Sequence, residues 1–214
     1  MTPRLALDWD GTCTEVDSLH MILERFGDRV VYEQMEGVLG DGLTLHEVIA
    51  AEIGTVTLPL EQGVRWVREH VIVRDGLHEL AARHRPVIVS SGFHELIEPV
   101  LEREGLELHV TANRVDPRPD GWRVLFREVP VCPVCEEPCK RSDLVGLDEI
   151  VFVGDGFSDR CVALAASRVF ARDGLATYLA SKGVPYEAFA DFYDVQRALD
   201  AVDSVLGSRD HSRP

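Results

Sequence analysis

Short apolar runs recur along this chain and alternate with segments that have helical periodicity. The first run covers Arg4–Leu7, and others lie near residues 86, 108, 150 and 168, each followed by a helical pattern or a turn. Such alternation is typical of a doubly wound parallel sheet. We therefore expect an α/β fold with a Rossmann-like parallel-sheet core. Further predicted elements are helices at 77–83, 93–104 and 193–206 and a hairpin turn at 118–122.

The segment between the first two strands has a helical pattern. Apolar residues recur at helical spacing over Val16–Gly27, and similar patterns cover Thr44–Ile53 and Leu60–His70. Because no strand pattern interrupts them, we predict a small helical cap domain inserted after the first strand. The predicted boundaries are 17–73 for the cap, 1–16 and 74–207 for the core, and 208–214 for a flexible tail.

Two acids end the first apolar run. They are Asp8 and Asp10, and Gly11-Thr12 follows them at once. In an open α/β sheet, ligands bind at the carboxyl ends of the strands. Two like charges this close to a buried strand repel one another unless a cation lies between them. The pair therefore suggests a site for a divalent cation, whereas the common alternative is two solvated acids in a loop.

Three later segments place further polar groups after apolar runs or loops. Ser90–Gly92 follows the second run, Lys140 follows a cysteine-rich loop, and Asp155 and Asp159 follow the run at 150–153. A serine at a strand end is often only a helix N-cap, and a single lysine is usually a surface charge. The order of all four segments is more specific than any one of them.

Together these segments resemble the motifs of the haloacid dehalogenase superfamily of phosphatases, and the resemblance covers nearly the whole chain. The helical pattern after the first motif is similar to the phosphoserine-phosphatase-like branch. Within that branch the chain looks most like the phosphatases of methionine salvage that act on 2-hydroxy-3-keto-5-methylthiopentenyl-1-phosphate. The segments that carry this closer resemblance are Met35–Leu39, Cys139–Lys140, Phe170–Asp173 and Asp191–Tyr193.

The resemblance implies a Mg²⁺-dependent phosphomonoesterase that acts on a small phosphorylated metabolite, with phosphoserine as the alternative substrate. Asp8 is then the nucleophile that forms an aspartyl-phosphate, and Asp10 is the general acid and base. The magnesium ion is expected on an Asp8 oxygen, the Asp10 backbone carbonyl and Asp155. Asp159 is expected to ligate the ion or to support its ligands.

The same resemblance assigns the phosphate to five residues. The side chains of Ser90 and Lys140 are expected to hold phosphoryl oxygens, assisted by the backbone N–H groups of Trp9, Ser91 and Gly92. Trp9 and Ser91 depart from the family, which usually has phenylalanine at the first position and, in this branch, glycine at the second. The backbone role of Trp9 does not depend on its side chain, although the bulk of the ring could reshape the pocket.

Four further residues are open candidates for contact with the substrate. Asp17 falls where phosphoserine phosphatases have a substrate-contacting glutamate, and Glu15 competes for that role. Either acid could instead start the cap helix, where acids are favoured. His20 on the first cap helix and His94 beside the phosphate-binding turn could also reach the substrate, although surface or core positions are the simpler expectation.

A cysteine-rich loop precedes Lys140. Three of the five cysteines, Cys132, Cys135 and Cys139, lie within eight residues of one another. The spacing suggests a structural zinc site, but such a site needs four ligands and the sequence clusters only three. The alternative is a reduced loop that orients Lys140. Disulfides are not expected in a cytoplasmic protein.

Composition narrows the choice of partners. The 214 residues include 37 acidic and 22 basic ones, which gives a net charge of -15. Such a surface repels nucleic acid and anionic membranes, so neither is expected as a partner, and a phosphate ester needs local positive charge at the site. No apolar run approaches the roughly 20 residues of a membrane helix. Since the chain begins directly with the first strand, we expect a cytoplasmic protein, either a monomer or a homodimer.

Two alternative functions belong to other classes of protein. A dinucleotide-binding oxidoreductase would use the glycines around Asp155, but Asp159 replaces the third glycine of that fingerprint and would repel a pyrophosphate. A signalling domain would share the fold if one of its aspartates were phosphorylated and the aspartyl-phosphate were hydrolysed slowly. Asp10 argues against it, because that residue would speed hydrolysis.

Overall fold

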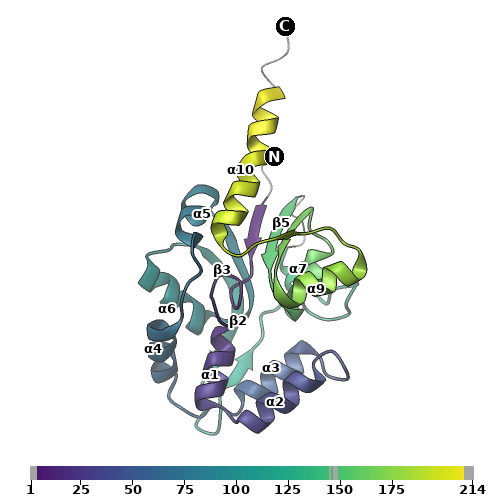
Figure 1. Cartoon of the computed structure of the whole chain (residues 1–214). Helices are drawn as coiled ribbons and strands as arrows, with labels where there is room; N and C mark the ends of the chain where they lie inside the picture. The colour runs from purple at the N-terminus through teal and green to yellow at the C-terminus, as the bar shows by residue number, and fades with distance from the viewer. Residues whose placement is uncertain (1–3, 145, 147–148, 210–214) are drawn as a thin grey trace.

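The computed structural model describes residues 4–144, 146 and 149–209, and a seven-stranded sheet forms its centre (Figure 1). The strand order is β4-β3-β2-β1-β5-β6-β7, and neighbouring strands are parallel except for β3 and β4. The predicted doubly wound α/β fold is therefore confirmed. The strands are β1 (Arg4–Leu7), β2 (Val87–Phe93), β3 (His109–Asp116), β4 (Arg123–Leu125), β5 (Ile150–Gly154), β6 (Arg168–Ala171) and β7 (Glu187–Ala188).

β1 lies in the middle of the sheet, between β2 and β5. Leu7 is in register with Ile88 of β2 and Val153 of β5. Leu5 and Leu7 belong to one hydrophobic cluster and Ala6 to the other, so both sides of β1 are buried. A strand that is covered on both faces is apolar throughout instead of alternating with polar residues. This explains why residues 5–7 of β1 are all apolar, directly before Asp8.

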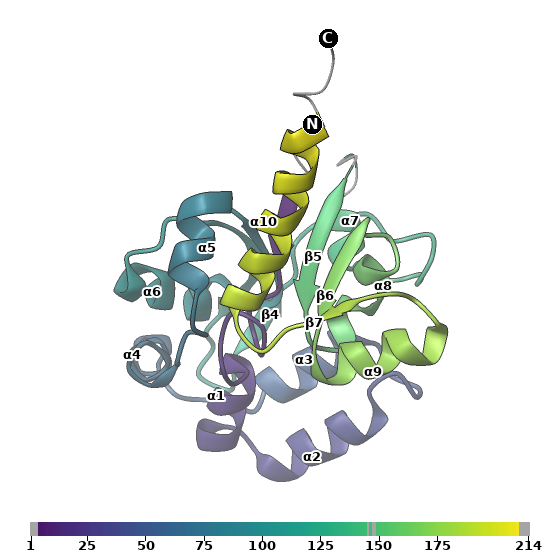
Figure 2. The ribbon, with the colours of Figure 1, turned by 45° about the horizontal axis from the view of Figure 1, so that its top comes forward.

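Helices cover both faces of the sheet (Figure 2). One hydrophobic cluster includes Leu80 of α5, Ile97 of α6 and Val195 of α10, and the other includes Val162 of α8 and Leu179 of α9. None of the helices in the described residues is long and apolar enough to cross a membrane. The bounds are α5 (Leu77–His84), α6 (His94–Glu104), α7 (Lys140–Asp143), α8 (Arg160–Ala163), α9 (Asp173–Lys182) and α10 (Phe192–Arg209), with a 3-10 turn at Phe157–Asp159.

Five helices lie between β1 and β2, and the first four of them precede the return to the core; in Figure 1 α1, α2 and α3 lie beyond the end of the sheet toward which β1 points. The chain leaves and re-enters the core at one place. The Glu15 N–H donates to the Ile72 carbonyl at 2.9 Å, and the Arg74 N–H donates to the Cys13 carbonyl at 2.8 Å. The four helices are α1 (Ser18–Phe26), α2 (Arg29–Val38), α3 (Leu45–Ile53) and α4 (Leu60–His70).

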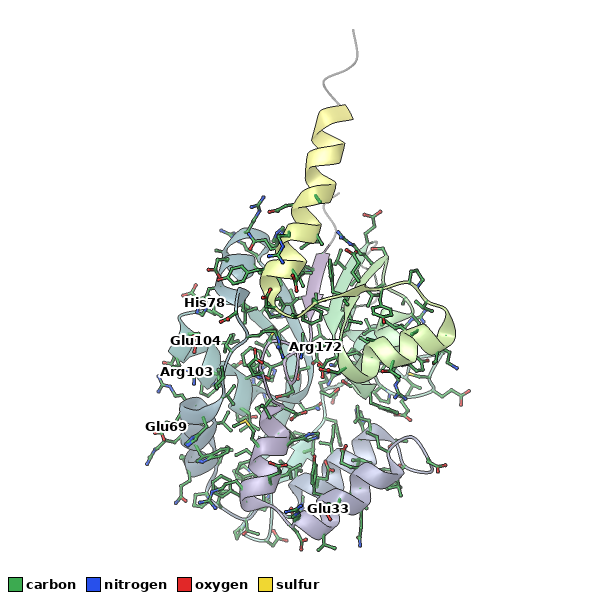
Figure 3. The ribbon with its side chains drawn as sticks, viewed as in Figure 1. Glu33, Glu69, His78, Arg103, Glu104 and Arg172 are labelled. Atoms are coloured by element: carbon green, nitrogen blue, oxygen red, sulfur yellow. The ribbon has the colours of Figure 1, made fainter. Side chains whose placement is uncertain are left out.

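α4 packs against both α1 and the core helix α6. Arg103 of α6 donates to the Val71 carbonyl just after α4, at 2.8 Å, and Glu104 lies 3.4 Å from His78 of α5. Figure 3 shows these three labelled side chains along one edge of the molecule. Because α4 contacts the core as well as the insertion, the boundary of the cap at residues 17–73 stays a prediction.

Two elements differ from the prediction at this level. The helix α2 was not predicted; none of its residues is fully buried, and its short apolar stripe consists of the half-buried Val31, Tyr32 and Met35. Its start is nonetheless encoded locally, since the Asp28 carboxylate accepts from the N–H groups of Val30 and Val31. At the other end of the chain, α10 continues to Arg209, two residues into the predicted tail, and residues 210–214 lie outside the described part.

The predicted hairpin turn joins β3 to β4. The Gly121 N–H donates to the Arg118 carbonyl at 3.1 Å, and β4 returns antiparallel to β3. Trp122 connects this hairpin to the insertion, because its backbone N–H donates to the Val56 carbonyl and its ring N–H donates to the Leu58 carbonyl, both at 2.8 Å. The hairpin is therefore hydrogen-bonded to the segment between α3 and α4.

Candidate active site

A pocket of about 320 Å³ lies where the carboxyl ends of β1, β2 and β5 face the inserted helices. Its floor comes from the core and its walls come from the insertion. This arrangement brings most of the predicted site residues into one cavity. The core side includes Asp8, Asp10, Gly11, Ser90, Ser91, Gly92 and Asp155, and the insertion contributes Asp17, Leu19, His20, Glu36, Leu39, Leu45, Val48, Ile49 and Glu52.

The turn after β1 allows both aspartates of the first motif to face this pocket. β1 ends at Leu7, so both acids lie in the loop that follows the strand, and the path of this loop directs their side chains. Gly11, directly after Asp10, allows the turn with φ +74°, and a Cβ built on it would lie 2.3 Å from Asp155 Oδ2. Glycine is therefore required at this position for both backbone and space.

Lys140 lies between two carboxylates behind the pocket. Its Nζ is 2.6 Å from Asp8 Oδ1 and 2.7 Å from Asp159 Oδ1, and the side chain is 1% exposed. Burial alone would lower the pKa of Lys140, but Asp159 and Asp8 raise it above its usual value. The lysine is therefore a fixed positive charge on the nucleophile candidate. It is not among the residues that line the pocket, and its contact with a phosphoryl oxygen stays a prediction.

Asp159 supports the turn that follows β5. Its Oδ2 accepts from the backbone N–H groups of Asp155 (2.9 Å) and Gly156 (3.0 Å), while its Oδ1 accepts from Lys140. A Cβ on Gly154 would lie 2.5 Å from Asp159 Oδ2, so the carboxylate packs directly on the strand end. Asp159 thus positions both Asp155 and the lysine.

Three carboxylates form a cluster that fits a magnesium ion. One oxygen from each of Asp8, Asp155 and Asp159 lies within 4.8 Å of the others. Burial and the charge of Asp159 raise the pKa of Asp155 to about 7, and the same two causes raise that of Asp8 well above its usual value. One lysine does not neutralise three buried acids, so a divalent cation with a preference for oxygen ligands suits this cluster.

Thr12 and Ser18 orient the two acids that project furthest into the site. The Thr12 hydroxyl donates to Asp155 Oδ1 at 2.6 Å. The Asp10 carboxylate accepts from both the backbone N–H (2.8 Å) and the hydroxyl of Ser18, the first residue of α1. Burial, followed by the charge of Asp17, raises the pKa of Asp10 to about 7, against the opposing effect of the Ser18 hydrogen bonds. A carboxyl group with such a pKa can both give and take a proton near neutral pH.

The predicted phosphate-binding residues divide into two groups. Ser90, Ser91 and Gly92 line the pocket, and the Gly92 N–H donates to Ser90 Oγ at 2.9 Å. Trp9 lies behind them: its ring is fully buried in the core, and its N–H donates to Asp8 Oδ1 at 2.7 Å. The ring is therefore not part of the pocket surface, and the Trp9 N–H holds the nucleophile candidate.

The four open candidates also divide. Asp17 and His20 line the pocket, and Asp17 is at the same time the N-cap of α1, because its Oδ1 accepts from the His20 N–H at 2.8 Å. For Asp17, capping of α1 and contact with a substrate in the pocket are thus compatible with each other. Glu15 instead pairs with Arg74 at 3.2 Å, and His94 lies 2.8 Å from the side chain of Glu98. Neither Glu15 nor His94 lines the pocket.

Two acids of the pocket wall were missed from the sequence. Glu36 lies on α2 and Glu52 lies on the buried face of α3, where its side chain is almost fully enclosed. Burial, then Glu36, raises the pKa of Glu52 to about 7, and its Oε1 has no hydrogen-bond partner among the described residues. The signal for Glu52 was an acid on the apolar face of a helical pattern.

Arg74 was also missed, although it holds the motif loop in place. Its side chain is buried and donates to the carbonyls of Gly11, Thr12 and Thr14, each at 2.9 Å. No periodicity marks such a residue, because its partners lie about 60 positions earlier in the chain.

The cysteine cluster is larger than predicted. Cys161 of α8, which is distant in sequence, joins the three predicted cysteines, so the cluster has four members.

Comparison with known proteins agrees with this geometry. A protein-family model for haloacid dehalogenase-like hydrolases matches residues 5–164. A relative from an Exiguobacterium species is 25% identical over 95% of this chain and 100% of its own length, and one from Bacillus mycoides is 24% identical over 93% and 96%. Both relatives are named 2-hydroxy-3-keto-5-methylthiopentenyl-1-phosphate phosphatase.

Solved structures show the same fold. A phospho-aspartyl intermediate analogue of phosphoserine phosphatase superposes with a TM-score of 0.68 at 17% identity, covering 92% of this chain and 99% of that chain. Phosphoserine phosphatase from T. onnurineus gives 0.66 at 19% identity, covering 93% and 94%. The family model spans most of the chain and includes the residues around Asp8, Ser90 and Asp155. The protein belongs to the haloacid dehalogenase-like hydrolases.

Proposed function

We propose that this protein is a Mg²⁺-dependent phosphomonoesterase that hydrolyses a small phosphorylated metabolite through an aspartyl-phosphate on Asp8. The observation that carries the proposal is the placement of the Asp8 carboxylate, 2.6 Å from Lys140, in a pocket that it shares with Asp10. The family match and the phosphatase names of the relatives support the same reaction class. The two acids have distinct surroundings, which suits two distinct roles.

The reaction divides into two displacements. In the first, an Asp8 oxygen attacks phosphorus, the bond from phosphorus to the ester oxygen breaks, and Asp10 gives its proton to the departing alkoxide. In the second, water attacks the phosphorus of the aspartyl-phosphate, Asp10 takes a proton from that water, and phosphate leaves with Asp8 restored. The pKa of Asp10, near 7, allows both transfers.

The pocket supplies donors for the phosphoryl oxygens from β2. The Ser90 hydroxyl and the backbone after it face the cavity from the side opposite Asp155. Lys140 contributes through Asp8, because its ammonium group contacts that carboxylate and opposes the rise in the pKa of Asp8 that burial causes. Positioning and neutralisation of charge are the main requirements of phosphoryl transfer, and these groups provide both.

Asp8, Asp155 and the Asp10 backbone carbonyl would hold the magnesium ion, with Asp159 orienting Asp155 and Lys140. When bound, the ion supplies positive charge to the phosphoryl oxygens and lowers the pKa of the clustered carboxyl groups. The fit rests on the cluster of buried oxygen ligands described above.

For the substrate, we propose 2-hydroxy-3-keto-5-methylthiopentenyl-1-phosphate, the compound in the names of the relatives. The inserted helices offer an apolar surface that suits a methylthioether tail. The apolar side chains on this surface are Leu39, Leu45, Val48 and Ile49.

Phosphoserine is the second candidate, and a specific observation favours it. Asp17, Glu36 and Glu52 place three carboxylates around the same wall, and His20 lies 3.9 Å from Asp17 and 3.8 Å from Glu36. A substrate that carries an ammonium group would neutralise part of this charge. The methylthiopentenyl compound has no such group, so the two candidates make different demands on Glu36 and Glu52.

Phosphate release from a panel of small phosphomonoesters, with and without Mg²⁺, tests the function. We expect Mg²⁺-dependent turnover of one compound far above the others, and none by the Asp8→Asn variant. A preference for phosphoserine that falls in Glu36→Gln would select the second candidate. Absence of release from every ester, together with a long-lived aspartyl-phosphate by mass spectrometry, would instead support a slow signalling domain.

A further inference from the structure

Four cysteines from two separate segments meet beside the active site but outside its pocket. Cys132, Cys135 and Cys139 lie on the loop before α7, and Cys161 lies on α8. Their Sγ atoms all lie within 4.8 Å of one another. All four are free thiols, and Cys132 is buried while Cys135 is exposed. The fifth cysteine, Cys13, is buried in the hydrophobic core around β1 and takes no part in the cluster.

The spacing of the sulfur atoms suits a tetrahedral metal site. Zinc binds thiolate sulfur at about 2.3 Å, which places two sulfurs of a tetrahedron about 3.8 Å apart. The Sγ atoms of Cys132 and Cys161 are 3.7 Å apart. A disulfide would require about 2.0 Å. The observed separation is therefore compatible with two ligands of one metal ion and excludes a bonded pair.

The loop is built so that its sulfurs converge. The Glu136 N–H donates to the Cys132 carbonyl at 2.9 Å, and Glu136 has φ +61°, so the backbone reverses within the Cys132-x-x-Cys135 segment. The backbone N–H groups of Val134 and Cys135 point at the Cys132 sulfur and interact with it. Donors of this kind stabilise a thiolate that is bound to a metal.

We infer that Cys132, Cys135, Cys139 and Cys161 bind one Zn²⁺ ion as a structural site. Four thiolates complete the coordination and leave no open position, which is the property of structural and not of catalytic zinc. The segment 130–139 contains neither helix nor strand, so a metal would supply the stabilisation that regular hydrogen bonding does not.

The site would also join the two segments that carry the buried ion pair. Cys139 immediately precedes Lys140, and Cys161 follows Asp159 by two residues. The metal would therefore fasten the start of α7 to α8, on either side of the 2.7 Å contact between Lys140 and Asp159. The zinc assignment does not depend on the proposed reaction, because metal content is measured without turnover.

Metal analysis of the purified full chain tests the inference. After dialysis against EDTA to remove weakly held ions, we expect about one zinc ion per chain in the wild type. Cys135→Ser should lower this content severalfold, and it is the preferred variant because the side chain is exposed. Cys13→Ala is the matched control and should keep its zinc. Asp155→Asn should also keep it, which separates the cysteine site from the acidic cluster.

Cobalt substitution provides a second measurement that does not need a cysteine variant to fold. Cobalt bound to the wild type should show the intense bands of tetrahedral thiolate coordination, and a mercurial reagent should release the metal as four thiols react. Wild-type protein that takes up neither zinc nor cobalt, with these thiols freely reactive, would overturn the inference. So would zinc that is lost in Asp155→Asn but retained in Cys135→Ser, or a site that contains iron in place of zinc.

Discussion

At the scale of single residues, the candidate site is a set of buried acids that differ in what surrounds them. Asp8 contacts the Lys140 ammonium, whereas Asp10 accepts hydrogen bonds from Ser18 and has no cation at hydrogen-bond distance among the described residues. The Lys140 ammonium lowers the pKa of Asp8 against the effect of burial, whereas Asp10 has no such partner in the described part of the chain. This difference supports the proposed division into nucleophile and proton carrier.

Asp8→Asn is expected to lower kcat by about a thousandfold or more, because an amide cannot form the acyl-phosphate. The fold should persist, since Asp159 still neutralises Lys140 and the repulsion between Asp8 and Asp159 is removed. Phosphate release and the thermal unfolding midpoint check both statements. Near-normal turnover would exclude Asp8 as the nucleophile.

Asp10→Asn is expected to reduce hydrolysis of alkyl phosphates by roughly 100- to 10,000-fold, the usual contribution of a positioned acid or base. A p-nitrophenyl ester needs no proton for its leaving group, so the first displacement should largely recover while the second stays slow. The measurement is a burst of p-nitrophenol equal to the enzyme concentration, with phosphoenzyme detected by mass spectrometry. A uniform loss for both esters, without a burst, would contradict the assignment.

Glu52→Gln is expected to stabilise the protein at high pH. The pKa of Glu52 is about 7 in the folded state and near 4.5 when exposed, so the folded state binds more protons between these values. Its contribution to stability is present below about pH 4.5 and is lost as the pH rises through 7. The variant should therefore gain roughly 1 to 3 kcal/mol over the wild type at pH 8 and only about a quarter of that gain at pH 5.

Urea unfolding at the two pH values measures this gain. Glu61→Gln, an exposed change on α4, serves as the control for the loss of one negative charge. Glu36, Asp17 and His20 surround Glu52, and their charges act on its carboxyl group equally in the wild type and in Glu61→Gln. An equal gain at pH 5 and pH 8 would show that the buried carboxyl is not the cause.

At the scale of elements, the site depends on how closely the strand ends approach one another. The loop after β1 is held by the Arg74 side chain, which comes from the segment that re-enters the core before α5. The end of β2 then packs on the same loop through a glycine. Because the atoms at such a contact are closely packed, one added carbon displaces the side chains that it meets.

Gly92→Ala tests that contact. A Cβ on Gly92 would lie 2.6 Å from Asp10 Oδ2 and 3.1 Å from Ser90 Oγ, so the Asp10 carboxylate must move. We expect kcat to fall by about 10- to 100-fold, in line with the cost of small displacements of catalytic groups. Gly37→Ala is the control: no atom lies within 4 Å of its Cβ, and the helix should gain about 0.5 to 1 kcal/mol. Equal activity of the two variants would contradict this account.

At the scale of the whole molecule, the pocket exists only between the sheet and the inserted helices. The core contributes the acids at the strand ends, and the insertion contributes the facing wall with three further acids, Asp17, Glu36 and Glu52. Net charge is -15, so the affinity for a phosphate ester depends on cations held at the pocket and not on the overall field. The cytoplasmic location and the monomeric or homodimeric state stay predictions.

Mg²⁺ is expected to raise the thermal unfolding midpoint of the wild type in a concentration-dependent manner. A ligand that binds only the folded state stabilises it by mass action, about 2.7 kcal/mol at a hundred times its dissociation constant. Asp155→Asn should abolish most of the response, whereas Glu61→Gln should preserve it. A response that is unchanged in Asp155→Asn would place the magnesium site elsewhere.

Much of the catalytic side of the pocket was predictable because each residue follows a strand that is itself visible in the sequence. Asp8, Ser90 and Asp155 end apolar runs, and parallel strands present their carboxyl ends at one edge of the sheet. The helices α1, α3 and α4 were predicted from their spacing, whereas α2, which buries no residue fully and has only a short apolar stripe, was missed.

The sequence by itself determined the α/β order, the strand-end acids and the loop with three cysteines, because these are properties of neighbouring residues. Tertiary structure alone decided which distant groups meet. It placed Lys140 behind Asp8, enclosed Glu52 in the pocket wall, and brought Cys161 to the cysteine loop. Hydrophobic periodicity specifies that a face is buried but not against what, so contacts between segments far apart in the chain appear only once the elements have packed.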